Sequence, residues 1–378
     1  MENKKIRMSL VFTIAFLFIG LCIIPMSSGV PVKKNIGVLG NPLGNVLYVG
    51  GNGSGNYSTI QEAIDDAING DTVFVFDDSS PYQENIRINK QISVIGENKD
   101  TTVINGISGQ DHAVRISAKN AEISGFTISG TADGQDGILV YPLMEDCIIS
   151  NNKVEDSSYG IYLQATSTKI TIIDNIISNN EFEGILLQES DRNIISGNTI
   201  TENGDFGISL EAVSKQNDIL DNTVENNFGG IQLAGSSSQN TISGNNVINN
   251  EREGILIEGV LTTTNEITGN NVTGNNAGMK VSNGGKNIIS SNNFKDNTIE
   301  GLYFMFSNEN IIEMNNFIGN RRNARYVASF RNTWDSNYWD DWIGLKFDIP
   351  FFKMFPKSIR GVSFRAYDMN PQEEPYNI

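Results

Sequence analysis

Short apolar and polar alternations recur along this chain with a fixed period. A Gly-Ile-x-Leu segment, or a close variant, starts every 23 or 24 residues, and Ala113-Val-Arg-Ile precedes the series in the same register. The repeat starts at Ala113, Gly137, Gly160, Gly184, Gly207, Gly230, Gly254, Gly278 and Gly301. Alternation with a period of two predicts strands, and three short strands with tight turns fill one repeat. The pattern therefore predicts a solenoid whose strands pair in parallel from coil to coil.

Asparagine forms three columns in phase with this repeat, always in the spacing Asn-x4-Asn-x4-Asn. The columns are Asn193, Asn217, Asn240, Asn265, Asn287 and Asn310; then Asn198, Asn222, Asn245, Asn270, Asn292 and Asn315; then Asn203, Asn227, Asn250, Asn275, Asn297 and Asn320. We expect each asparagine to adopt the left-handed backbone of a one-residue corner. We also expect the amides to stack and satisfy the polar groups that the corners bury. These columns are interpreted as scaffold.

On these residues the chain resembles the right-handed parallel β-helix proteins, in particular the pectin-lyase-like and NosD-type carbohydrate-binding and sugar-hydrolase β-helices. Residues 57–73 look like the entry helix and first strand of pectin-lyase-like folds. Either Ser58 with Gln61 or Thr59 with Glu62 forms a capping box, and an apolar face follows at Ile60, Ala63, Ile64, Ala67 and Ile68. The fold class is thus all-β, a right-handed parallel β-helix of about 23 residues per three-strand coil, with an N-terminal capping helix and an aromatic-rich C-terminal cap.

The chain divides into five segments by composition. Residues 1–29 read as a signal peptide or an N-terminal anchor, because Lys4, Lys5 and Arg7 precede an apolar run and small residues. Residues 30–57 are a linker, 58–112 the capping helix and first coils, 113–333 the regular repeats and 334–378 the cap. All three tryptophans lie in the last segment, where residues 349–356 also suit a glycan-binding or membrane-interfacial role. We expect an extracellular or cell-surface protein, with membrane attachment through the N-terminal segment left open.

Composition and charge exclude several classes. The chain holds 49 asparagines and 37 glycines, both poor helix formers, so it is no helical bundle. A net charge of −17 provides no basic stripe for nucleic acid. Beyond Cys22 only Cys147 remains, so no intramolecular disulfide forms. His112 is the single histidine and is expected to be an exposed turn residue, with no zinc triad.

The candidate site lies on the outward face of the Gly-Ile-x-Leu strand, where the resemblance places polysaccharide in related β-helices. Aromatic rings there offer stacking surfaces, and amides and carboxylates offer directional hydrogen bonds. The predicted ligand-binding residues are Tyr159, Tyr162, Glu183, Gln188, Phe206 and Glu211. The candidates for hydrolysis are Glu183, Asp205 and Glu211, since hydrolysis needs carboxylates on neighbouring coils, and Arg252 beside Glu253 is a candidate base for elimination. A merely solvated outer face is the alternative, and the short turns build no wall around a cleft.

Three functions follow. The first is a secreted or cell-surface β-helix protein without catalysis that binds polysaccharide or cell-envelope glycan, or serves as a rigid envelope element. The second is a polysaccharide lyase or glycoside hydrolase of the pectin-lyase-like fold. The third, a periplasmic copper-maturation protein, is implied only by the NosD resemblance, because Met144 and Cys147 form the one close pair of soft ligands. No cofactor or metal site is predicted, calcium stays open, and the oligomeric state is left unassigned.

Overall fold

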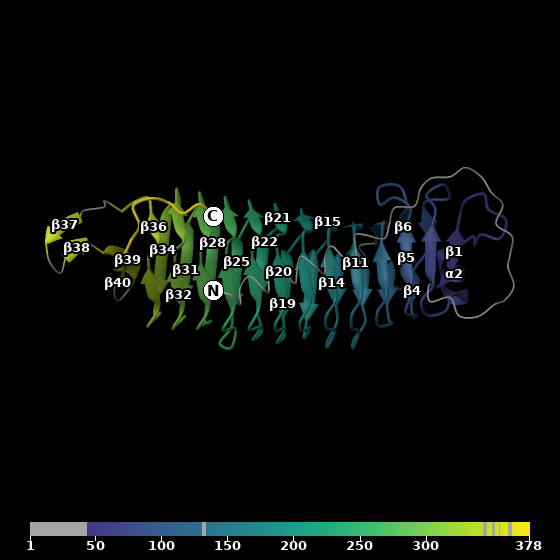
Figure 1. Cartoon of the computed structure of the whole chain (residues 1–378), viewed down its shortest axis with the longest axis horizontal. Coiled ribbons are helices and arrows are strands. Elements are labelled where there is room, and N and C mark those ends of the chain that lie inside the picture. Colours follow the sequence, from purple (N-terminus) through teal and green to yellow (C-terminus); the bar gives the residue numbers. More distant parts are fainter. Residues whose placement is uncertain (1–43, 131–133, 343–345, 350–351, 355, 362–364) are drawn as a thin grey trace. The chain divides into compact units, whose positions relative to one another are not determined.

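Three sheets, parallel except for one antiparallel pair at the C-terminal end, run along a stack of coils in the computed structural model, which describes residues 44–378 except 131–133, 343–345, 350–351, 355 and 362–364 (Figure 1). Each sheet takes one strand from nearly every coil. Two strands that pair within a sheet are therefore usually three strands apart in the sequence. The predicted right-handed parallel β-helix is confirmed, with 13 strands in each of two sheets and 12 in the third.

Sheet A consists, in spatial order, of β1 (Val46–Val49), β2 (Thr72–Val75), β5 (Ser93–Gly96), β8 (Glu122–Ser124), β11 (Ile148–Ser150), β14 (Thr171–Ile173), β17 (Ile194–Ser196), β20 (Asp218–Leu220), β23 (Thr241–Ser243), β26 (Glu266–Thr268), β29 (Ile288–Ser290), β32 (Ile311–Glu313) and β35 (Thr333–Asp335). Sheet B consists of β3 (Tyr82–Gln83), β6 (Val103–Asn105), β9 (Thr127–Ser129), β12 (Lys153–Glu155), β15 (Ile176–Ser178), β18 (Thr199–Thr201), β21 (Thr223–Glu225), β24 (Asn246–Ile248), β27 (Asn271–Thr273), β30 (Asn293–Lys295), β33 (Asn316–Ile318) and β36 (Tyr338–Trp339).

Sheet C contains the Gly-Ile-x-Leu strands and is the sheet that positions the candidate site. It consists of β4 (Ile86–Ile88), β7 (Val114–Ile116), β10 (Ile138–Val140), β13 (Ile161–Leu163), β16 (Ile185–Gln188), β19 (Phe206–Glu211), β22 (Gly229–Leu233), β25 (Glu253–Glu258), β28 (Ala277–Ser282), β31 (Glu300–Met305), β34 (Arg322–Val327), β39 (Lys357–Gly361) and β40 (Arg365–Asp368). A separate hairpin pairs β37 (Lys346–Ile349) with β38 (Phe352–Met354).

The core is filled by equivalent apolar residues stacked from coil to coil. In sheet A, for example, Ile172, Ile195 and Ile219 are aligned and fully buried. The repeat glycines lie just before the sheet C strands or at their second position, because the coils approach closely there: a Cβ added to Gly184 would lie 2.7 Å from the carbonyl oxygen of Gly207. No larger residue fits that position without movement of the backbone.

Helix α2 (Ile60–Asp66) packs against the first coils. Thr59 is its N-cap, with Oγ1 accepting from the Glu62 backbone N–H at 3.3 Å, which decides between the two capping boxes. The predicted apolar face is too long, because the helix ends at Asp66 and Ile68 is 64% exposed. Among the described residues, no helix is long and apolar enough to span a bilayer, and the predicted leader lies outside them.

The three asparagine columns form continuous buried hydrogen-bond ladders. In the central ladder, Asn245 Nδ2 donates to Asn270 Oδ1 at 2.9 Å, and its Oδ1 accepts from both the backbone N–H and Nδ2 of Asn222. In the central ladder, Nδ2 also donates to a backbone carbonyl of the preceding coil, as Asn245 does to Ile219 at 2.9 Å. The ladders therefore satisfy the polar groups of the corners, as predicted.

The expected backbone of these asparagines is wrong, however. The left-handed residue is the one before each ladder asparagine, such as Arg192 (φ 58°), Thr264 (φ 57°) and Met314 (φ 55°). These corner residues face solvent or its boundary, and the turn that they make directs the following asparagine inward. The residue with the left-handed backbone and the asparagine with the buried amide are thus neighbours in the sequence.

The C-terminal end of the core changes from aliphatic to aromatic. Phe294, Phe317 and Trp339 stack in successive coils of sheet B, with centroids 5.3 and 4.3 Å apart. Trp334 and Trp339 lie in β35 and β36, so the coils continue into the segment expected to form the cap. Asp368 ends the central ladder by accepting from Asn337 and from Trp339 Nε1, each at 3.0 Å.

Candidate functional site

The outward residues of sheet C lie in one straight column. Parallel pairing aligns Tyr162 with Leu186, then with Ser209 and Gln232 in the next two coils. Since each coil adds one strand about 4.8 Å further along the stack, residues far apart in sequence become neighbours on this face. The column has the order that the repeat predicts.

Aromatic rings gather at β13 and the turns beside it. The Tyr159 ring lies 5.4 Å from that of Tyr162 and 5.3 Å from that of Phe182, centroid to centroid. Phe206, a predicted ligand-binding residue, is only 5% exposed, and a Cβ on Gly229 would lie 2.3 Å from its ring. Phe206 therefore forms part of the floor, while Tyr159, Tyr162 and Phe182 offer the accessible rings.

Hydrogen bonds fix the polar groups beside these rings. Tyr162 Oη donates to Gln188 Oε1 at 2.6 Å. Ser209 Oγ lies 2.9 Å from Gln232 Oε1 and 3.3 Å from Glu211 Oε1. Burial raises the pKa of Tyr162, and the charges of Asp136 and Glu211 raise it further, so the phenol stays protonated and keeps its donor.

Glu183 is the buried carboxyl group of this region. It precedes β16, is 8% exposed, and forms no hydrogen bond or ion pair with another side chain in the described part of the chain. Burial raises the pKa of Glu183 to about 7, and the negative charges of Asp205 and Glu211 act in the same direction. The three predicted catalytic candidates are thus close enough to interact electrostatically.

We call these residues the sheet C patch: Tyr159, Tyr162, Phe182, Glu183, Gln188, Asp205 and Glu211. The patch unites accessible rings, a fixed amide and a carboxyl group that is half-protonated near neutral pH. It contains six of the seven residues predicted as ligand-binding or catalytic, and Phe206 lies beneath it. Phe182 was missed, because it stands outside the repeated columns.

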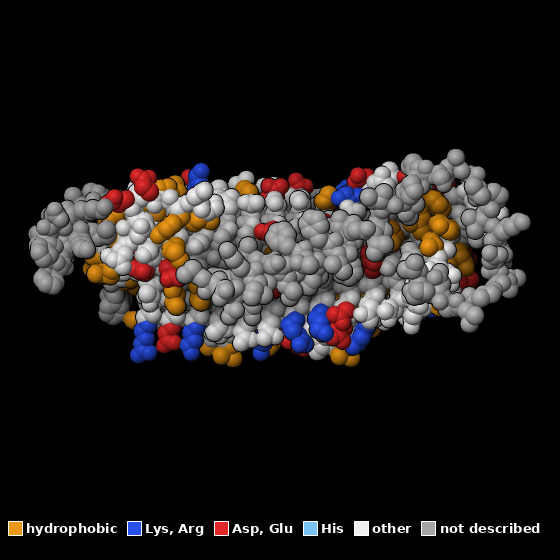
Figure 2. Space-filling model, viewed as in Figure 1, with side chains coloured by type: hydrophobic (Ala, Val, Ile, Leu, Met, Phe, Trp, Pro, Cys, Tyr) orange, Lys and Arg blue, Asp and Glu red, His pale blue; other side chains and the backbone are white. Residues whose placement is uncertain are grey.

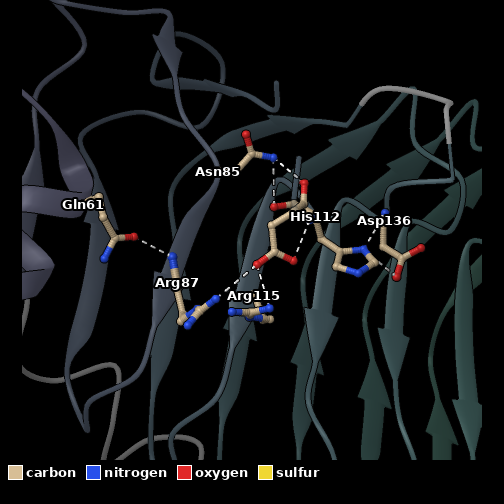
Figure 3. A network of polar contacts seen from close by, with 7 residues as sticks. Gln61, Asn85, Arg87, His112, Arg115 and Asp136 are labelled. Carbon is tan, nitrogen blue, oxygen red and sulfur yellow. Dashed lines mark hydrogen bonds and ion pairs between the residues drawn. The ribbon is translucent and has the colours of Figure 1, made fainter. Parts of the chain in front are cut away.

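A second polar network, in the N-terminal coils, was missed as well (Figure 3). His112 Nδ1 lies 3.1 Å from Asp136 Oδ2 and 3.0 Å from the Asp136 backbone nitrogen. The expectation of an exposed turn histidine is wrong, since only 25% of the side chain is exposed. The hydrogen bond with Asp136 raises the pKa of His112. The two residues occupy equivalent positions in adjacent coils, which is the signal that could have found the pair.

Arginines border the same network. Arg115 Nη1 lies 2.7 Å from Asp111 Oδ2, and Arg87 Nη2 lies 3.6 Å from that oxygen. The backbone N–H of Arg87 donates to Gln61 Oε1 of α2 at 2.7 Å, and Asn85 Nδ2 donates to the carbonyl of Asp111. These contacts join the entry helix to the first coils, and the single carboxylate of Asp111 is shared by the two arginines.

A cavity of about 170 Å³ lies at the C-terminal end, away from the sheet C patch, lined by residues that include Arg322, Trp339, Lys357 and Ile359. Two of its cations are paired: Arg322 Nη1 lies 3.1 Å from Glu300 and Lys357 Nζ lies 2.6 Å from Asp341.

The donor set for a metal does not fit copper. Within the described residues no three His, Cys, Asp or Glu side chains converge on one point. Cys147 is buried, its Sγ donates to the carbonyl of Ala118 at 3.2 Å, and burial raises the pKa of its thiol. A neutral, buried thiol is a poor soft-metal ligand.

Coils, ladders and outward columns together define a parallel β-helix repeat protein. Two family models match the chain: "right handed beta helix region" over residues 112–264 and "periplasmic copper-binding protein (NosD)" over residues 206–344. The resemblance to the right-handed β-helix proteins of NosD type is confirmed over these residues.

Individual relatives extend the comparison. A cell surface glycoprotein of Methanothermus fervidus is 32% identical over 106 residues, which are 28% of this chain and 17% of that glycoprotein. Among solved structures, the A-modules of the Azotobacter vinelandii mannuronan C-5 epimerases AlgE4 and AlgE6 align with TM-scores of 0.62 and 0.64 and identities of 20% and 18%. They cover 72% and 74% of this chain and 90% and 88% of their own. The Dettilon tailspike protein aligns with a TM-score of 0.56 at 20% identity. The alignment covers 75% of this chain and 68% of the tailspike chain. At these identities the structural likeness shows the fold.

Proposed function

We propose that this protein is exported to the cell surface and binds polysaccharide along the outer face of sheet C. The carrying observation is the sheet C patch, where the rings of Tyr159, Tyr162 and Phe182 lie beside hydrogen-bonding groups on a face that short turns leave open. Rings of this kind stack on sugars, and flanking amides and carboxylates fix their hydroxyl groups. The basic and apolar leader and the glycoprotein relative support an exported, surface location.

A binding experiment tests the proposal. We expect Tyr162→Ala to abolish binding of oligosaccharides identified on a glycan array, because it removes one ring and the hydrogen bond to Gln188. Tyr303→Ala is the matched control, since Tyr303 occupies the same outward column six coils further along. Circular dichroism confirms that both variants fold. Equal loss of binding in the two variants, or no loss in either, contradicts the assignment to this patch.

A second candidate function is catalysis on the bound polysaccharide. The pKa of Glu183, about 7, suits a general acid, and the charges of Asp205 and Glu211 act on it. Glycoside hydrolysis uses such an unequal pair of carboxyl groups. Reducing-end and unsaturated-product assays test this function: turnover that Glu183→Gln and Glu211→Gln abolish establishes an enzyme, whereas binding without turnover supports the first function.

A further inference from the structure

The buried acids of sheet C provide an internal comparison. Four acidic residues in the position before the repeat residue are buried: Asp136, Glu183, Glu253 and Glu300. Less than a tenth of the surface of each is exposed, and all four occupy nearly equivalent places in the coil. Because a buried charge is costly unless it is paired, each needs a compensating partner.

Three of these acids have a partner in the protein. Asp136 contacts His112, and Glu253 Oε1 lies 3.2 Å from Lys280 Nζ. Glu300 Oε1 lies 3.1 Å from Arg322 Nη1. Glu183 has no such cation within the described residues, so it is the exception in its own column.

Some acids elsewhere on the surface are paired with cations as well. On the face drawn in Figure 2, Lys and Arg side chains lie beside Asp and Glu side chains near the margins. Glu145, for example, lies 3.0 Å from Lys119 and 2.6 Å from Lys169. Asp205 and Glu211 surround Glu183 with further negative charge rather than balancing it.

We infer that the cation missing at Glu183 is supplied by the ligand, and that the sheet C patch binds a glycan carrying a free amino group. This inference rests on the proposed function. An ammonium group placed among Glu183, Asp205 and Glu211 gains charge-assisted hydrogen bonds, while the adjacent rings of Tyr159 and Tyr162 stack on the sugar. Glycans of uronic acids are disfavoured, because their carboxylates would meet these acids without a cation between them.

A matched series of ligands tests the class. The probes are a β-1,4-linked glucosamine hexamer, its fully N-acetylated counterpart and a galacturonate hexamer, titrated into the full chain in a slightly acidic buffer. We expect the amino form to bind at least roughly tenfold more tightly than the acetylated form, as one charge-assisted hydrogen bond provides, and the uronate to bind more weakly than both. Glu183→Gln should remove most of this preference, so that the amino and acetylated forms bind the variant with similar affinity.

The acidic chain also attracts polycations without specificity, so Glu225→Gln is the control. Glu225 lies on sheet B and its replacement removes the same charge from a different face. Equal weakening by both variants would show general attraction and overturn the inference. Equal affinity for the amino and acetylated forms, or preference for the uronate, overturns it as well, yet leaves polysaccharide binding in place if Tyr162→Ala abolishes it. Binding of none of the three hexamers overturns the amino-glycan inference, and a glycan array without hits overturns the proposed function too.

Discussion

Neutralising Glu183 should stabilise the folded protein, but only at higher pH. The carboxyl group has a pKa of about 7 in the fold against an ordinary value of 4.5. This difference corresponds to about 3 kcal/mol of unfolding free energy, at about 1.4 kcal/mol per pKa unit. A group whose pKa is raised on folding contributes fully below its unfolded value, and the contribution is lost as pH rises through the folded value. The wild type is therefore penalised above about pH 7.

The variant Glu183→Gln keeps the shape of the side chain and removes its titration. We expect the same stability as the wild type near pH 4 and a gain of up to about 3 kcal/mol above pH 7. Urea unfolding followed by tryptophan fluorescence across this range measures the difference, with amide hydrogen exchange in β13 and β16 as a local reading. Glu225→Gln is again the control. A gain that is independent of pH, or a loss of stability in alkaline solution, would refute the claim that Glu183 is buried without a cationic partner.

Three further predictions concern the scaffold and the histidine pair. Asn245→Ala removes five hydrogen bonds of the central ladder and should cost about 3 kcal/mol in urea unfolding, whereas Asn246→Ala, on the outward face next to it, should cost less than about 0.5 kcal/mol. Thr264→Asn should raise the free energy of unfolding by about 1 kcal/mol, because a β-branched residue is strained at φ 57°. The hydrogen bond to Asp136 raises the pKa of His112. The stability that this pair adds to the fold is therefore fully present below about pH 6.5 and is lost as pH rises through the raised pKa. His112→Gln should therefore destabilise by about 1 kcal/mol in acidic solution and by less in alkaline solution, as thermal unfolding at both pH values will show.

The sequence alone predicts most of the fold, because coils of nearly equal length can pair in only one register. The outward order Tyr162, Leu186, Ser209 and the stacked amides follow from that register. The corner geometry does not follow, since residues as different as Arg192 and Met314 adopt the left-handed backbone. Solvent exposure lets many side chains occupy the corner before the first asparagine column, whereas glycine, asparagine and aspartate prevail before the second and third columns.

The site could be predicted only in part. Columns place Glu183 and Glu211 one coil apart, but they do not reveal how deeply each lies. The burial of Glu183 depends on its turn and on the neighbouring coils, and the partner of His112 lies in the adjacent coil. Both depend on contacts between coils, which a reading of one repeat at a time misses.

In a solenoid, function is marked by departure from the repeat. Glu253 and Glu300 show that this column can hold a buried acid at low cost, because a lysine or arginine one coil away balances it. Selection for stability alone would place a cation beside Glu183 or replace the acid by an apolar residue. The ladders stabilise the rest of the fold. In the central ladder, every asparagine side chain from Asn198 to Asn315 is hydrogen-bonded to the asparagines of both neighbouring coils. The chain can therefore tolerate about 3 kcal/mol of unbalanced charge at one coil, and a ligand that neutralises Glu183 recovers that energy as binding affinity.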